Sequence, residues 1–347
     1  MKPNKTVPNH PSARVAGTSR SVFSAIVAAL LMAALTAAAR SQHFSPKHSR
    51  ALPWLKPGDI VYADSGDALD GGFIIKVDGA TGDSMVLCSG GYLQTPFDLV
   101  VDRRGQIIVS DSGRLIEIDP RDGAQTLLAD NSRGPLGWPF GLALTPTGDV
   151  LAANLTSVVR FDAETSQVRV AASGGHLAQP LAVATSNNGF FFVLDLGPIN
   201  QIIRVNRQTH AQRVITKGGL LNHPQAIAVQ GEHIYVTDIA DLDNSFGTGR
   251  IICVNAKTGS QTVVSEGGNL VRPVGIAVDE EDQIIVGDPY TINPNSLHIR
   301  DGGFDGGIIR IDPDTGGQTL LARGQGGFLN PRGVAIVPNS AIAQANK

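Results

Sequence analysis

The sequence predicts an all-β fold, a six-bladed β-propeller with four strands in each blade, from three observations. A loop proline recurs at Pro96, Pro139, Pro180, Pro224, Pro273 and Pro331, with spacings of 43, 41, 44, 49 and 58 residues. A period in the forties that holds several short strands is typical of propellers and solenoids. The composition agrees, because 40 glycines and only 5% aromatic residues favour many turns and short strands over long helices.

Each full repeat contains four strand-like segments in a fixed order. The first follows the proline, at residues 99–101, 142–144, 182–184, 227–229 and 276–278. The second ends at an Asp or Asn, at residues 107–111, 150–154, 191–195, 234–238 and 284–288. The third covers residues 115–119, 158–162, 202–206, 251–255 and 308–312, and the fourth covers 126–129, 168–171, 213–216, 262–265 and 319–322. The first two segments are almost continuously apolar, which indicates strands covered on both faces, as in stacked blades.

Turn residues separate these segments where hairpins are expected. Asn188-Gly189 lies between a first and a second strand, and Thr315-Gly316 lies between a third and a fourth. Glycine adopts a positive φ without steric penalty, which such tight turns require. Glycine pairs such as Gly267-Gly268 connect a fourth strand to the next repeat.

The third observation concerns the two ends of the repeat region. Residues 58–64, 73–78 and 85–88 have the patterns of a second, third and fourth strand, so the first repeat lacks its first strand. Residues 332–337 match a first strand and have no repeat of their own. We therefore predict that this C-terminal strand completes blade one and closes the ring, which leaves no open sheet edge.

The N-terminal region has the pattern of an export signal. The first 50 residues contain no Asp or Glu, basic residues precede an apolar run at 22–39, and Ala37 and Ala39 are small residues at the −3 and −1 positions. We expect an export signal peptide at 1–39, a flexible leader at 40–51, the propeller at 52–338 and a C-terminal tail at 339–347. The expected location is periplasmic or extracellular, with no stable membrane span after processing. The alternative is an anchor formed by an uncleaved N-terminal segment, since 18 apolar residues are near the minimum for a span.

Charge and cysteine content limit the classes of partner and environment. Removing residues 1–39 removes four of the 28 Lys and Arg residues and none of the 31 Asp and Glu residues, which leaves a net charge of −7. An acidic protein is a poor partner for nucleic acid or anionic membranes. The two cysteines, Cys88 and Cys253, lie in different repeats, and we expect two buried free thiols.

The repeat units resemble a known family. The segments PVGIAVD at 273–279, IIVGD at 284–288 and GIIRIDPDTG at 307–316 are similar to NHL-type repeats, and to the wider six-bladed group that contains gluconolactonases and regucalcin. The resemblance covers roughly residues 58–338. It implies the propeller fold, but one fold hosts many activities, so function depends on the site.

The resemblance also implies where a metal site would lie. In the gluconolactonase group, acidic or amide residues at the start of inner strands hold a divalent metal at the channel mouth. The matching positions are Phe97, Phe140, Leu181, Gln225, Val274 and Arg332, and none is a carboxylate. A hard cation needs oxygen ligands, so this ring disfavours lactonase chemistry. Asp98 is one residue out of register and is expected to face the other way.

The histidines and the recurrent Asp residues each have a structural and a functional interpretation. Streptogramin-lyase and peptide-amidating-lyase propellers use histidines, but His176, His210, His223, His233 and His298 are scattered here, which favours solvated loop residues over a zinc site. The residue ending each second strand is Asp64, Asp111, Asn154, Asp195, Asp238 or Asp288. Its repetition favours a carboxylate that accepts loop N–H groups over a ligand-binding role.

The connections between second and third strands differ in length. They are short in blades two to four and long and acidic in blades five, six and one, which are consecutive in a closed ring. We expect the long connections to form an acidic crescent beside the channel mouth. The candidate binding residues combine this crescent with two polar ring residues: Asp64, Asp67, Asp70, Asp238, Asp241, Asp243, Asp288, Asp301, Asp305, Gln225 and Arg332. Calcium is the one cofactor considered, although no loop has the EF-hand spacing, and no catalytic residue is assigned.

The sequence therefore predicts an exported NHL-type β-propeller that acts as a binding module for a protein, peptide or glycan on its loop face. The alternative is a metal-assisted hydrolase or lyase, gluconolactonase-like or streptogramin-lyase-like, with a diverged site. The apolar channel ring and the absence of the family's metal ligands favour the binding module. Stoichiometric divalent metal in the purified protein would favour the enzyme.

Overall fold

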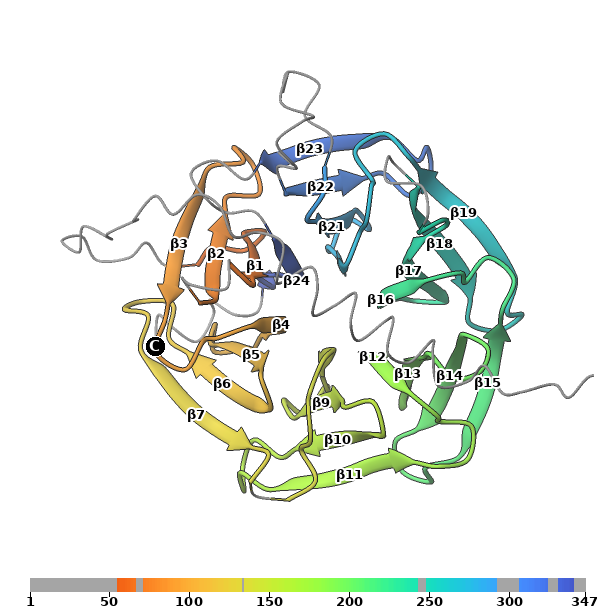
Figure 1. Ribbon diagram of the computed structural model, residues 1–347, viewed down its shortest axis with the longest axis horizontal. Helices are drawn as coiled ribbons and strands as arrows, with labels where there is room; N and C mark the ends of the chain where they lie inside the picture. Colours follow the sequence, from red (N-terminus) through yellow and green to blue (C-terminus); the bar gives the residue numbers. More distant parts are fainter. Residues whose placement is uncertain are drawn as a thin grey trace, which may run out of the picture. The chain divides into compact units, whose positions relative to one another are not determined.

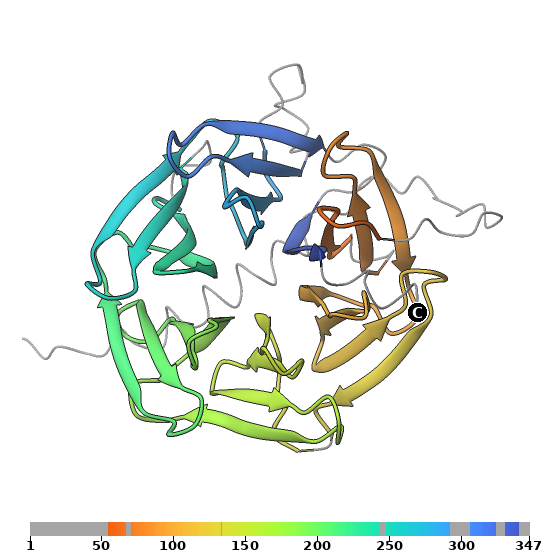
Figure 2. The ribbon, with the colours of Figure 1, turned by 180° about the vertical axis from the view of Figure 1, so that it is seen from behind.

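The computed structural model describes residues 55–66, 71–132, 134–242, 248–291, 306–323 and 330–339. These residues form 24 β-strands and no α-helix, so none of the described segments is a helix long and apolar enough to cross a membrane. The strands form six four-stranded antiparallel sheets, which stand as blades around a ring (Figure 1), seen from behind in Figure 2. The predicted six-bladed propeller is confirmed.

In each blade the strands follow one another from the channel to the rim. Blade one consists of β24 (Pro331–Ile336), β1 (Ile60–Asp64), β2 (Phe73–Val77) and β3 (Ser84–Ser89), and blade two consists of β4 (Pro96–Val101), β5 (Ile107–Asp111), β6 (Arg114–Ile118) and β7 (Gln125–Asp130). Blade three consists of β8 (Leu142–Leu144), β9 (Val150–Ala153), β10 (Ser157–Phe161) and β11 (Val168–Ser173), and blade four consists of β12 (Pro180–Thr185), β13 (Phe190–Asp195), β14 (Gln201–Asn206) and β15 (Gln212–Lys217). Blade five consists of β16 (Pro224–Gln230), β17 (His233–Ile239), β18 (Gly249–Asn255) and β19 (Gln261–Glu266), and blade six consists of β20 (Gly275–Val278), β21 (Ile284–Asp288), β22 (Gly307–Ile311) and β23 (Gln318–Arg323).

The ring is closed by the C-terminal strand, as the sequence predicts. β24 pairs antiparallel with β1, with Ile336 opposite Ile60 and Val334 opposite Tyr62. The pairing extends past the strand ends, because Val337 N donates to Asp59 O at 2.8 Å and Gly58 N donates to Val337 O at 3.0 Å. Blade one is thus assembled from the two ends of the described chain.

Apolar residues on both faces of each blade build six cores, one at each junction between neighbours. β13 shows the principle. Phe191 and Val193 pack in the cluster shared with blade three, whereas Phe192 and Leu194 pack in the cluster shared with blade five. Successive side chains of a strand point to opposite faces, so an uninterrupted apolar run serves two cores at once.

The outermost strands of the blades run head to tail around the rim (Figure 1). In several blades, a glutamine at the start of this strand is hydrogen bonded to the loop that follows the outermost strand of the preceding blade. Gln212, the first residue of β15, accepts from His176 N at 2.7 Å through Oε1 and donates to Gly174 O at 3.1 Å through Nε2. Gln125, Gln261 and Gln318 make the same pair of bonds to the loops before β4, β16 and β20. Glycine is favoured at both positions of the loop because φ is 60° at Gly174 and 61° at Gly175, and a Cβ on Gly175 would also lie 2.7 Å from the Gln212 Oε1.

The two cysteines are free, and only one of them is fully buried. Cys88 is buried and its Sγ donates to Gly123 O at 3.3 Å, whereas Cys253 is partly exposed. Burial raises the pKa of both thiols. The expectation of two free thiols is confirmed, and the expectation of full burial is wrong for Cys253, which lies on the third strand of blade five near the rim.

Candidate functional site

Two faces of the ring differ in the connections that they carry. The connections from second to third strands, and those from one blade to the next, lie together, because Asp111 at the end of β5 accepts from Gln94 N at 2.6 Å and Thr95 N at 3.0 Å in the loop before β4. We call this the loop face. The opposite face, the turn face, carries the short turns between first and second and between third and fourth strands.

The recurrent Asp residues are buried parts of the loop face. Asp288 is fully buried, and its carboxylate accepts from Val271 N at 2.7 Å, Arg272 N at 2.9 Å and Tyr290 N at 2.8 Å. Burial raises the pKa of Asp288 to about 7, against the opposing effect of these donors. The carboxylate therefore holds the loop that leads into β20.

Asp64 and Asp238 have the same position in their blades. Asp64 accepts from Asn330 N at 3.2 Å, and burial raises its pKa to about 6. Asp238 accepts from His223 N at 2.9 Å and from Arg250 Nε at 3.0 Å. Both carboxylates are fully buried. The structure thus shows the hydrogen bonds that the structural interpretation expects, while a direct role of these residues in ligand binding stays a prediction.

Blade three has an Asn where the other blades have the recurrent Asp, and its loop accounts for the difference. Asn154 replaces the recurrent Asp, and its Nδ2 donates to Pro135 O and Leu136 O, each at 3.1 Å. In the other blades the loop presents N–H groups to this position, but here it presents carbonyl oxygens, which only a donor can satisfy. Asn154 Oδ1 still accepts from Ser157 N at 2.8 Å. The amide therefore matches a loop with reversed hydrogen-bonding polarity.

The channel ring of the loop face combines apolar residues with two polar ones, Gln225 and Arg332. Phe97 and Phe140 pack with ring centroids 4.8 Å apart. Gln225 Nε2 donates to His223 O at 3.0 Å. Arg332 is 9% exposed, its Nε donates to Ser65 Oγ at 3.4 Å, and burial lowers the pKa of its guanidinium.

Bulges decide where several ring side chains lie. The register of the first strand shifts between Pro96 and Asp98, between Pro180 and Ala182, and between Pro224 and Ala226. The residue skipped by each shift is the ring residue after the proline. A bulge re-aims the extra side chain, so simple alternation does not place these positions.

Asp98 follows one of these bulges, on the innermost strand β4. Its Oδ2 accepts from Leu142 N of the next blade at 2.8 Å and its Oδ1 accepts from Leu99 N at 2.9 Å. Gly333 of blade one packs against the same carboxyl group, since a Cβ added to Gly333 would lie 2.1 Å from Asp98 Oδ1. Burial raises the pKa of Asp98 to about 7.

The raised pKa of Asp98 predicts a pH-dependent contribution to stability. An unfolded Asp has a pKa near 3.9, so between roughly pH 4 and pH 7 the folded protein holds a proton that the unfolded chain has lost. The free energy of unfolding therefore falls as the pH rises through this window, by roughly 4 kcal/mol at most from this group. We expect Asp98→Asn to reduce the pH dependence of the melting temperature between pH 4 and pH 8, while Asp64 and Asp288, whose pKa values are also raised, keep their own contributions. An identical slope in the variant and the wild type would contradict the assignment.

Much of the predicted crescent lies outside the described residues. This is true of Asp67, Asp70, Asp243, Asp301 and Asp305, and of His298. Asp241 is exposed on the loop after β17, and Thr248 Oγ1 donates to its carbonyl oxygen. Among the described residues no three His, Cys, Asp or Glu side chains are grouped as for a metal ion. The calcium site stays a prediction.

Most of the large exposed apolar side chains of the described residues lie on the loop face. Tyr92, Trp138, Ile199 and Leu242 lie on four separate loop-face connections, at 42%, 54%, 54% and 39% exposure. The other two, Val170 and Val263, lie on the outer strands β11 and β19. This set was not predicted from the sequence, although a tryptophan beside a loop proline, Trp138-Pro139, was a signal for it.

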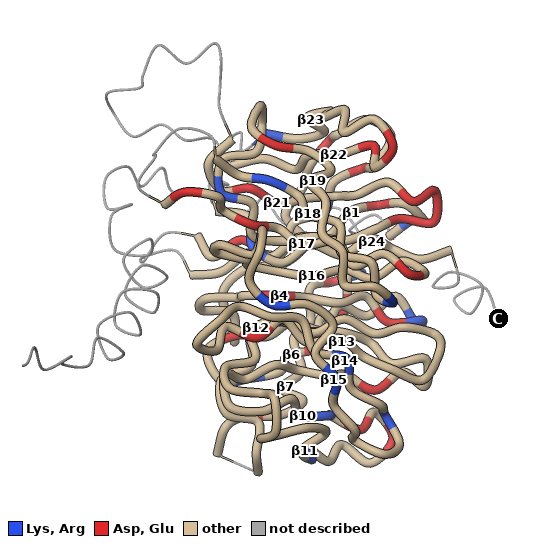
Figure 3. Tube along the Cα trace, turned by 90° about the vertical axis from the view of Figure 1, so that its right-hand side faces the viewer, with Lys and Arg blue, Asp and Glu red and all other residues tan. Residues whose placement is uncertain are grey.

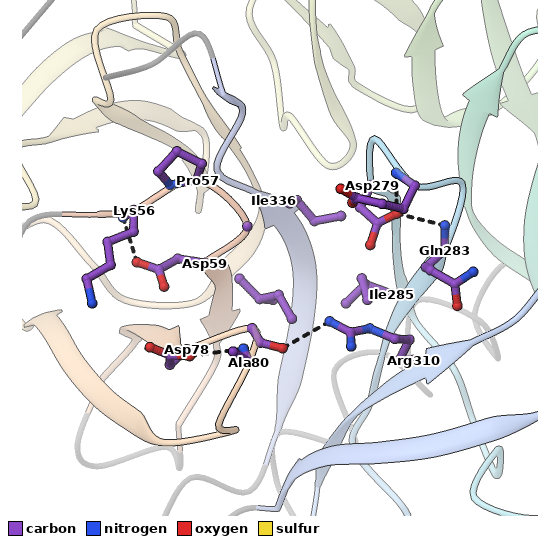
Figure 4. Close-up of a pocket in the computed structure, with 14 residues that line it drawn as sticks. Lys56, Pro57, Asp59, Asp78, Ala80, Asp279, Gln283, Ile285, Arg310 and Ile336 are labelled. Atoms are coloured by element: carbon purple, nitrogen blue, oxygen red, sulfur yellow. Dashed lines mark hydrogen bonds between the residues drawn. The ribbon is translucent and has the colours of Figure 1, made fainter. Parts of the chain in front are cut away.

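The turn face contains a cavity of about 580 Å³ between blades six and one. Figure 4 shows its walls, with Lys56, Asp59 and Asp78 of blade one on the left and Asp279, Gln283 and Arg310 of blade six on the right. Ile336 of β24 lies between the two walls. In the edge-on view of Figure 3, acidic residues occupy several turns to the right of the labels β22 and β1. This cavity was not predicted from the sequence.

Comparisons with solved structures support the fold. A chain of a nidogen/laminin complex is similar with a TM-score of 0.63 and 14% identity, over 81% of this chain and 98% of that one. TolB from Acinetobacter baumannii is similar with a TM-score of 0.60 and 13% identity, over 81% of this chain and 67% of that one. No protein-family model matches the sequence, and no curated protein matches it significantly. At these identities the likeness shows the six-bladed fold and nothing finer.

Proposed function

We propose that the protein is a binding propeller that takes a protein or peptide partner on its loop face. The observation that carries this proposal is that four of the six large exposed hydrophobic side chains among the described residues, Tyr92, Trp138, Ile199 and Leu242, lie on that face. Exposed aromatic and aliphatic side chains are the usual anchors of a protein interface, with tryptophan and tyrosine enriched among the residues that contribute most.

The architecture of the loop face supports the proposal. Asp111 holds the loop of Tyr92 by accepting from Gln94 N at 2.6 Å and Thr95 N at 3.0 Å. Asn154 holds the loop of Trp138 by donating to Pro135 O and Leu136 O, each at 3.1 Å. These two aromatic side chains therefore stand on loops that are held before binding, which lowers the entropy lost on association. The nidogen/laminin structure is a complex, which gives a precedent for partner binding by a protein of this fold. Export, and membership of the NHL-type group, remain parts of the proposal.

The test compares two pairs of serine substitutions. Peptides are selected from a displayed random library on the wild-type protein, and their affinities are measured for Trp138→Ser/Ile199→Ser and for Val170→Ser/Val263→Ser. The first pair removes loop-face anchors, so we expect affinities at least about tenfold weaker. The second pair removes similarly exposed side chains from the outer strands and should change nothing. Unchanged binding by the loop-face pair, or equal losses in both pairs, would contradict the proposal.

A further inference from the structure

A charged pair recurs between the second and third strands of the blades. In blade one Lys76 Nζ lies 2.7 Å from Asp59 Oδ2, and in blade three Arg160 Nη2 lies 2.9 Å from Asp149 Oδ2. In both blades the acid is five residues before the Asp or Asn that ends the second strand, and the base is two residues before the Asp that ends the third segment. These two positions are diagonal neighbours across an antiparallel pair.

Blade four keeps the base and changes its partner. Arg204 lies over the ring of Phe190, with 4.5 Å from its Cζ to the ring centroid. The quadrupole of an aromatic ring attracts a cation, so this arginine is also compensated within its own blade. The base at this position thus has a partner supplied by the second strand in blades one, three and four.

Blade six has the base without the partner. Arg310 occupies the basic position and the neutral Gln283 occupies the acidic one. Arg310 Nη2 donates to Gly79 O of blade one at 3.0 Å, and its Nε is buried without a hydrogen-bond partner, the one such side-chain atom among the described residues. The guanidinium of Arg310 therefore lacks the carboxylate partner that the bases of blades one and three have. Its planar group is suited to an acceptor with two oxygens, such as a carboxylate.

This arginine lines the turn-face cavity (Figure 4). A volume of about 580 Å³ lies in the range of small-molecule sites. Ile285 and Ile336 provide apolar surface, and the exposed Lys56 adds a second positive charge across the cavity. The cavity therefore offers a carboxylate-binding group, apolar surface, and space for a ligand of several residues.

The acidic residues of the cavity exclude a simple anion as the preferred ligand. The lining contains two basic side chains, those of Lys56 and Arg310, and four carboxylates. The carboxylates are those of Asp59, Asp78, Asp279 and Glu281. Asp279 Oδ1 accepts from Glu281 N at 3.0 Å and from Gln283 N at 2.7 Å. These turn N–H groups leave Asp279 Oδ2 able to accept from a ligand. Asp78 likewise uses Oδ1 for Ala80 N and Thr81 N. A ligand that matches this lining carries a positive group as well as a carboxylate.

We propose that the cavity between blades six and one binds a small zwitterion, a free amino acid or a short peptide, with its carboxylate on Arg310 and its ammonium group toward Asp279 and Glu281. The carboxylate supplies the counter-charge that Asp59 and Asp149 supply in blades one and three. This site is on the face opposite to the proposed partner surface and does not depend on it.

The first test uses the ligand chemistry. L-leucine and trialanine are titrated into the wild-type protein by calorimetry, together with the amide of each, which lacks the carboxylate, and the N-acetyl form of each, which lacks the ammonium group. We expect at least one parent compound to bind and both of its blocked forms to bind at least about tenfold more weakly. Comparison of L-leucine with trialanine shows whether the site prefers a free amino acid or a short peptide. No saturable binding of either parent at millimolar concentration, or equal binding of a blocked form, overturns the proposal.

The second test restores the missing partner. Gln283→Asp copies the pair of blades one and three, so it should neutralise Arg310 from within, leave the melting temperature at or above that of the wild type, and weaken zwitterion binding at least about tenfold. Gln283→Asn is the matched control, because it shortens the same side chain without adding charge and should keep binding. Trp138→Ser/Ile199→Ser should bind the zwitterion as the wild type does, even if the loop-face proposal fails. Wild-type affinity in Gln283→Asp overturns the assignment to Arg310.

Discussion

Deleting residues 332–347 is expected to abolish cooperative folding. The deletion removes β24 after Pro331, so β1 loses the strand opposite Ile60 and Tyr62 and becomes an open edge. It also removes the buried side chains of Arg332, Val334 and Val337 from the junctions of blade one with its neighbours. The loss exceeds what one strand contributes, because both neighbouring cores open, and it is comparable with the whole stability of a domain, about 5–15 kcal/mol. Circular dichroism on heating should show no cooperative transition.

The control deletion ends the chain after Asn339. It leaves β24 intact, together with the hydrogen bond from Asn339 N to Glu280 Oε1 at 3.2 Å. We expect this variant to melt within a few degrees of the full chain. If the longer deletion also melts within a few degrees of the full chain, then closure by β24 is not what stabilises the ring.

Asn154→Asp is expected to destabilise the protein by roughly 2–4 kcal/mol at neutral pH. The new carboxylate would face Pro135 O and Leu136 O, which now accept from the Asn154 amide, so two hydrogen bonds become contacts between acceptors in a buried place. Below the pKa of the unfolded aspartate the carboxyl is protonated and can donate to one carbonyl, so most of the loss should disappear by about pH 4. Urea unfolding at both pH values measures this.

The reverse exchange between Asp and Asn provides a matched control elsewhere in the repeat. Asp312 accepts from Asp314 N at 2.9 Å and Thr315 N at 3.0 Å in the turn after β22. Asn206 accepts in the same way at the equivalent position of blade four. The turn uses this side chain only as an acceptor, so Asp312→Asn should change stability by less than about 0.5 kcal/mol. Equal effects of the two exchanges would show that loop polarity is not what selects Asn154.

The fold was predictable because the residues that begin and end each strand, and the apolar runs between them, are patterns of neighbouring residues. The recurrent prolines and the Asp residues that end the second strands mark each blade, and the unmatched strand at 332–337 fixes the closure by elimination. Strand boundaries agree with the prediction within three residues, and they agree fully at Leu142–Leu144.

The site was less predictable because it depends on relations between repeats. Asn154 was visible as an exception, but its cause, the carbonyls of a loop containing Pro135, depends on the direction of backbone groups. Gln283 and Arg310 each look ordinary alone, and only the pairs in blades one and three reveal the missing charge. The bulge before Asp98 likewise alters which face a side chain takes, which strict alternation cannot express.

The closure of blade one has a consequence for the order in which the protein can be made. Ile60 pairs with Ile336, so the partner of the first described strand emerges from the ribosome only after all the other described strands. Contacts so distant in sequence form slowly, because a long loop must close before they contribute any stability. Blades two to six can pair their strands as they emerge, while β1 keeps an unpaired edge until β24 has been synthesised. The ring of such a nascent chain therefore closes in one late step.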